Sequence, residues 1–128
     1  MTKKEKFHIE YVFDKVSVRS LWNHLTTAMG LSSWFADAVN ISGSRYTFVW
    51  NREQEEAELL EEKPEVKVRY RWLNEEYADY YFEFLIHSIE LTGATSLEIT
   101  DFAEPDEKAD AIALWDSQVD VLKRTLGI

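Results

Sequence analysis

The chain has 128 residues, of which 45% are hydrophobic and 14% aromatic, and it carries a formal net charge of −10. This length and composition predict a single folded domain spanning residues 1–128 and exclude a disordered chain. The negative charge argues against nucleic acid and anionic membrane surfaces as partners, and the absence of Cys excludes disulfides, thiol catalysis and zinc sites built from Cys.

The first residues are polar and contain no apolar core of a signal peptide, and no apolar run approaches the length that spans a membrane. We therefore expect a cytoplasmic protein without membrane insertion. The pattern leaves the oligomeric state open.

Apolar and polar residues alternate over residues 6–14, which predicts a half-buried strand. Ser17 is then a plausible N-cap for a helix whose apolar residues recur at steps of three and four (Val18, Leu21, Trp22, Leu25 and Met29). We expect Gly30 to interrupt this helix. A second short helix is predicted over Leu31–Asp37, capped by Ser32 or Ser33.

Strand patterns resume after this helix pair and continue to residue 102. The predicted strands cover residues 38–41, 45–50, 53–62, 65–72, 80–89 and 95–102, with turns near Gly43, Asn51, Pro64 and Gly93 and an acidic loop over residues 73–79. The segment 53–62 holds six Glu, which favours a helix, but its local alternation and its neighbours favour a strand. The alternation is clearest before residue 73, where one face carries Val66, Val68, Tyr70 and Trp72.

The chain closes with an amphipathic helix that Pro105 and Asp106 start and Gly127 stops. Its apolar stripe follows helical spacing (Ile112, Trp115, Val119, Leu122 and Leu126). The order of elements predicts an α+β fold, in which a curved antiparallel sheet of about seven strands wraps this helix and two short helices follow the first strand.

Five motifs carry a family resemblance: Val18-Arg19-Ser20-Leu21-Trp22, Gly30-Leu31-Ser32-Ser33-Trp34-Phe35, Val68-Arg69-Tyr70-Arg71-Trp72, residues 92–100 and Leu114-Trp115. In this order they resemble the START/birch-pollen-allergen (SRPBCC) superfamily, most of all its heat-shock-protein ATPase activator homologues. The resemblance covers nearly the whole chain and implies the helix-grip fold. One departure is the stretch before the mid-sheet strands, which is often rich in Gly and Pro in the family but here holds only Gly43. The family includes lipid carriers, hormone receptors, cyclases, hydrolases and co-chaperone domains, so the fold does not select a function.

The faces assigned inward are rich in rings, which suits a cavity between the sheet and the closing helix. Tyr and Trp rings carry polar atoms beside an apolar wall, as an amphipathic ligand requires, although the same rings could fill a close-packed core. The residues predicted to bind such a ligand are Trp34, Phe48, Trp50, Val68, Tyr70, Trp72, Phe82, Phe84 and Trp115. No catalytic residue, metal ligand or cofactor is predicted.

His8 and His87 could approach each other across the sheet, but a metal site would need a third ligand, so ordinary histidines are the favoured interpretation. Glu83 and His87 could form an acid–base pair, although solvated or cross-strand pairs are favoured. The acidic segment 53–62 is interpreted as a solvated face that could dock a basic protein.

Three functions follow in order of preference: a domain that binds a small hydrophobic or amphipathic molecule, a protein-interaction module resembling a co-chaperone, and an enzyme of the cyclase or hydrolase type. The sequence contains no HExxH, no GxSxG and no glycine-rich loop before a helix. The enzyme hypothesis therefore depends on a few ionisable groups (Asp79, Glu83, His87 and Asp101).

Overall fold

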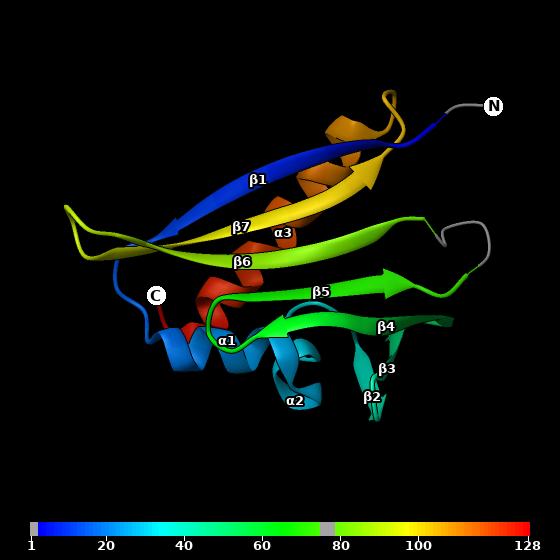
Figure 1. Ribbon diagram of the computed structural model, residues 1–128, viewed down its shortest axis with the longest axis horizontal. Helices are drawn as coiled ribbons and strands as arrows, with labels where there is room; N and C mark the ends of the chain where they lie inside the picture. Colours follow the sequence, from blue (N-terminus) through cyan, green and yellow to red (C-terminus); the bar gives the residue numbers. More distant parts are fainter. Residues whose placement is uncertain (1–2, 75–78) are drawn as a thin grey trace.

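The computed structural model describes residues 3–74 and 79–128, which form seven strands and three helices (Figure 1). In chain order these are β1 (Glu5–Phe13), α1 (Val18–Thr26), α2 (Ala28–Leu31), β2 (Ala38–Ser42), β3 (Arg45–Trp50), β4 (Glu53–Lys63), β5 (Lys67–Trp72), β6 (Tyr81–Ile89), β7 (Ala94–Ala103) and α3 (Lys108–Leu126). The strands form one antiparallel sheet in the order β1-β7-β6-β5-β4-β3-β2. Figure 1 shows α3 crossing behind β7, β6 and β5, so the predicted helix-grip fold is confirmed.

The core lies between the inner face of the sheet and α3, as the alternation predicts. Tyr70 on β5 pairs with Phe82 on β6, and Val68 with Phe84, and all four side chains are buried. From the other side, α3 buries three residues of its predicted stripe (Trp115, Val119 and Leu122). Burial of so many apolar side chains is the main stabilising contribution to this fold.

The glutamate-rich segment is strand β4, which settles the ambiguity in its composition. Ala57 is fully buried and Leu59 packs against the core, while Glu58 and Glu61 pair with cations of β5 on the outer face. The register shifts between Leu59 and Glu61, which marks a β-bulge. Burial of one face and pairing of the other therefore override the helical propensity of Glu.

The second short helix was predicted in the wrong place. Instead of residues 31–37 with a Ser32 or Ser33 cap, α2 covers Ala28–Leu31, and the Oγ1 atom of Thr27 caps it by accepting a hydrogen bond from the backbone N–H of Gly30 at 2.9 Å. Gly30 does not interrupt a helix. A Cβ atom there would lie 2.2 Å from the carbonyl oxygen of Asn23, so glycine is what lets α2 pack directly on α1.

Two apolar residues assigned to buried faces are exposed. Met29 lies on α2 and is 85% exposed, and Val66 is 37% exposed. Glu65 has a φ of +63°, which places the chain in a turn, and β5 begins only at Lys67. Val66 therefore belongs to the turn and not to the inward face of the strand.

The predicted helix ends are largely confirmed. The Ser17 hydroxyl accepts from the backbone N–H of Ser20 at 3.2 Å, and Gly127 ends α3 in the left-handed conformation with a φ of +79°. α3 begins at Lys108, so Pro105 and Asp106 lie in the turn before it.

Of the predicted acidic loop 73–79, residues 75–78 lie outside the described part of the chain. Within residues 3–74 and 79–128, no helix has a stretch both long and apolar enough to cross a bilayer.

Candidate functional site

A groove with a volume of about 430 Å³ opens between the inner face of the sheet and α3, and we call it the sheet–helix groove. Its lining consists of Lys4, Phe35, Trp50, Glu53, Glu55, Trp72, Phe82, Asp101, Phe102, Ala111, Leu114, Trp115 and Gln118. A second cavity of about 420 Å³, the loop cavity, lies beside residues 32–37 and also reaches Trp50, Gln118 and Val121.

Phe35 belongs to the lining of both cavities, as do Trp50 and Gln118. Its ring stacks on Phe82 and Trp115, with centroids 5.3 and 5.7 Å apart. Its carbonyl accepts hydrogen bonds from the indole Nε1 of Trp50 at 2.7 Å and from the amide Nε2 of Gln118 at 3.0 Å. These contacts tie the turn after α2 to β3 and to α3.

The nine residues predicted to bind a ligand divide into three groups. Trp50, Trp72, Phe82 and Trp115 line the sheet–helix groove, and Trp34 lines the loop cavity together with Trp50. The other four are fully buried and belong to the lining of neither cavity (Phe48, Val68, Tyr70 and Phe84). For these four, contact with a ligand stays a prediction. Sequence reasoning did not place Phe35 and Gln118 among the site residues.

The polar atoms of three buried rings are engaged within the protein. The last carbonyls of a helix lack partners inside the helix. At the end of α1, the carbonyl of His24 accepts from Trp34 Nε1 at 2.7 Å and the carbonyl of Leu25 from Tyr70 Oη at 2.7 Å. The carbonyl of Thr26 accepts from Tyr46 Oη at 3.0 Å. Burial raises the pKa of both tyrosines, so both hydroxyls stay protonated donors. These rings therefore hold the end of α1 against the sheet, and their polar atoms do not point to a ligand.

Both oxygen atoms of the Asp101 carboxylate, at the wall of the groove, accept hydrogen bonds within the protein. Its Oδ2 atom accepts from the indole Nε1 of Trp115 and its Oδ1 atom from the backbone N–H of Phe102, both at 2.8 Å. Burial raises the pKa of Asp101, although these two donors and the charge of Lys4 oppose the shift. The side chain thus orients Trp115 and places an acidic group at the groove wall.

The chemistry of the groove is an aromatic wall with an acidic rim. Six rings line it (Phe35, Trp50, Trp72, Phe82, Phe102 and Trp115), and its ionisable residues are three carboxylates and one amine (Glu53, Glu55, Asp101 and Lys4). Such a site can hold an apolar body by burial, and its net negative rim complements a positively charged group.

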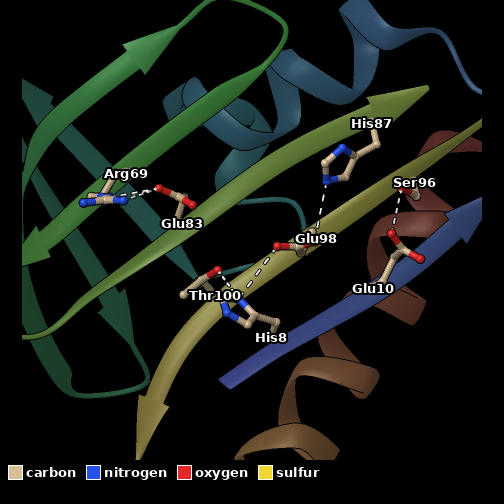
Figure 2. Close-up of polar contacts among 8 residues, drawn as sticks. All are labelled: His8, Glu10, Arg69, Glu83, His87, Ser96, Glu98 and Thr100. Atoms are coloured by element: carbon tan, nitrogen blue, oxygen red, sulfur yellow. Dashed lines mark hydrogen bonds and ion pairs between the residues drawn. The ribbon is translucent and has the colours of Figure 1, made fainter. Parts of the chain in front are cut away.

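The residues named for catalysis do not converge. Figure 2 shows Glu83 on the outer face of the sheet, where its Oε1 atom accepts from Arg69 Nε at 2.9 Å. His87 Nε2 lies 3.5 Å from Glu98 Oε2 on the neighbouring strand. The possible acid–base pair of Glu83 and His87 is therefore not formed, and the favoured cross-strand pairing is confirmed. Asp79 is exposed, and of the four groups Asp101 alone belongs to the lining of the sheet–helix groove or the loop cavity.

Comparison with known structures shows how widely this architecture occurs. The solution structure of BfR322 from Bacteroides fragilis is 41% identical with a TM-score of 0.66, over 98% of this chain and 92% of that chain. The Aha1 dimer from Colwellia psychrerythraea is 20% identical with a TM-score of 0.82, over 97% of each chain. CalU16 from Micromonospora echinospora is 16% identical with a TM-score of 0.75, over 96% of this chain and 76% of that chain. The last two similarities show a common fold alone.

Among curated proteins, no match to the chain was found. The model of the START-like superfamily domain, in contrast, matches residues 1–128. The similarity to the Aha1 structure agrees with the fold that the predicted resemblance implies. The match over the whole length, together with the sheet that wraps α3, shows that the chain belongs to the START-like superfamily.

Proposed function

We propose that this protein binds a small amphipathic molecule in the sheet–helix groove. The observation that carries the proposal is the groove of about 430 Å³, in which Trp50, Trp72 and Phe82 of the sheet face Trp115 of α3. Ligand sites in proteins have volumes of about 300–1,000 Å³ and are mostly apolar with a few placed polar groups. The groove meets both conditions.

The charge of the rim indicates which amphipathic molecules fit. The lining contains three carboxylates and one amine. The carboxylates are Glu53 and Glu55 at the start of β4 and Asp101 on β7, and the amine is Lys4. Trp faces also attract cations, because their π systems present negative potential. We therefore propose a ligand with an aromatic or aliphatic body and a positively charged amine.

Three probes with one ring system and different charge test this proposal: 1-naphthylmethylamine, 1-naphthalenemethanol and 1-naphthoate. Binding is followed by the indole N–H signals of Trp50 and Trp115 in ¹H–¹⁵N NMR spectra. The amine is expected to bind most tightly and the carboxylate most weakly, and the double variant E53Q/E55Q should reduce the difference. Equal affinities for the three probes would contradict the charge preference but leave the groove as a binding site.

A matched pair of variants tests the location. Leu114 lines the groove and is 60% exposed, whereas Leu91 is 98% exposed in the β6–β7 turn and lines neither cavity. Leu114→Arg should weaken the amine because it adds bulk and positive charge at the rim, and Leu91→Arg should not. Absence of saturable binding for every probe, or equal loss in both variants, would refute the groove as the site.

The alternative of an interaction module with an acidic docking face has less support. Three glutamates of β4 form ion pairs within the protein: Glu56 with Arg45, Glu58 with Arg71 and Glu61 with Lys67. These pairs neutralise much of the face that was expected to attract a basic partner. The similarity to the Aha1 dimer is one of fold.

A further inference from the structure

A second group of residues that could bind a ligand lies on the opposite side of the sheet from the groove. We call Glu10 of β1, Glu98 of β7 and His87 of β6 the outer-face cluster. Glu10 is directly opposite Glu98, and His87 is directly opposite Ser96, so the three side chains share one face. Figure 2 shows them on adjacent strands with His8 beside Glu98.

The distances within the outer-face cluster suit a shared metal ion. One donor atom from each of the three residues lies within 4.8 Å of the other two. Two ligand atoms on a tetrahedral zinc ion lie roughly 3.3 Å apart, because each bond is about 2.0–2.1 Å long. His87 Nε2 and Glu98 Oε2 are already 3.5 Å apart, so small rotations of the exposed Glu10 side chain would complete the set.

Neighbouring groups orient these ligands. The Ser96 hydroxyl donates to Glu10 Oε2 at 3.3 Å. The second carboxylate oxygen of Glu98 lies 3.7 Å from His8 Nδ1, and His8 is held in turn by the Thr100 hydroxyl at 2.8 Å. Metal-binding carboxylates are commonly fixed by such outer contacts, which contribute to affinity.

The charges of the outer face give a second, independent argument. Over β3–β6, the glutamates at positions 56, 58, 61 and 83 each form an ion pair with an Arg or a Lys. Glu98 instead contacts the imidazole rings of His8 and His87, which carry a charge only when protonated, and it faces Glu10 directly across the strand pair. Like charges in directly opposed positions destabilise a sheet. A bound cation would remove this repulsion.

We propose that Glu10, His87 and Glu98 bind a divalent metal ion of the zinc type, with water as the fourth ligand. His8 is a positioning residue that holds Glu98. The sequence predicted no metal site because His8 and His87 supplied two ligands at most, and the missing ligands come from the register of β7 with its two neighbours. This site lies on the other face of the sheet, so it does not depend on the proposed groove.

The test uses untagged, chelator-treated protein and zinc chloride, followed by isothermal titration calorimetry and by NMR of the histidine rings. We expect saturable binding of one equivalent and a shift of the His87 ring signals. His8→Ala should weaken binding by about ten-fold, the lower end of the usual cost of losing an outer contact, and His87→Ala and Glu98→Gln should each weaken it by more, because each removes a ligand. His24→Ala is the matched control, because His24 lies on α1 and its ring contacts the Ser20 carbonyl.

Glu10→Gln separates a metal site from a simple ion-pair network. It should raise the melting temperature of the metal-free protein, because it removes the repulsion from Glu98, and it should abolish the further increase that zinc causes. No saturable binding at millimolar zinc, an unchanged His87 signal, or equal weakening by His24→Ala and His87→Ala would overturn the proposal.

Discussion

The end of α1 offers the sharpest test of how the rings stabilise this fold. Tyr70→Phe removes one hydroxyl, which donates at 2.7 Å to the carbonyl oxygen of Leu25. Tyr70 and Leu25 are both 0% exposed, so water cannot replace the lost donor. The variant therefore leaves a buried carbonyl without its partner, while the packing of the ring is unchanged.

The size of the effect follows from this burial. A buried acceptor that loses its partner costs about 1–3 kcal/mol, and we expect about 2 kcal/mol for Tyr70→Phe. For a domain of this length, 1 kcal/mol corresponds to a melting-temperature change of roughly 3–5 °C. The expected decrease is therefore about 6–10 °C.

Tyr11→Phe is the matched control. The Tyr11 hydroxyl donates to Asp116 Oδ1 at the same distance, 2.7 Å, but at an exposed position on the side of α3. Water can hydrate Asp116 after the substitution, so the cost should be about 0.5 kcal/mol. Urea unfolding of both variants, followed by tryptophan fluorescence, measures the difference. Equal destabilisation of the two variants would refute the argument that buried ring hydroxyls hold α1.

Three further substitutions test other contacts. Gly30→Ala should destabilise the protein by about 1–3 kcal/mol in urea unfolding, although Ala favours helices, because its Cβ would lie 2.2 Å from the Asn23 carbonyl oxygen; an increase in stability would show that α2 moves freely. Glu83→Gln should cost about 1.5–3 kcal/mol, since Glu83 is buried and bonded to Arg69 at 2.8–2.9 Å; a loss below 0.5 kcal/mol (roughly the surface-pair value) would contradict this. Burial raises the pKa of Asp101, so the folded state binds its proton more tightly and stability falls as pH rises from about 3.8 through the folded pKa. The stability of Asp101→Asn relative to the natural chain should therefore improve over that pH range, and a constant difference in thermal melts would contradict the shift.

The fold could be predicted from the sequence wherever one face of an element is buried. Residues 67–72 alternate because β5 has one dry and one wet face, and the stripe of α3 repeats because one side of the helix packs on the sheet. The position of α2 could not be predicted in this way. A glycine within a helical pattern indicates a break, and only the approach of the Asn23 backbone explains why Gly30 lies inside a helix.

The candidate site could be predicted by face but not by depth. Phe48 and Trp50 lie on the same side of β3, yet Phe48 is fully buried in the core whereas Trp50 lines both cavities. Alternation has a period of two and says nothing about where along a strand the covering helix ends. That position depends on the turn at Phe35 and on the crossing of α3, which are tertiary features.

The partners of the tyrosine hydroxyls could not be predicted from the sequence either, and they affect which residues can select a ligand. Tyr70 was predicted to contact a ligand, but its hydroxyl donates to the end of α1, as the Tyr46 hydroxyl also does. In the proposed function, polar selection in the groove comes from its rim, where Glu53 and Glu55 lie. In this proposal, stability and ligand preference depend on different residues, and effects at separate sites are expected to add. Tyr70→Phe should lower the melting temperature without changing the affinity for the amine probe, and E53Q/E55Q should lower that affinity with little change in stability.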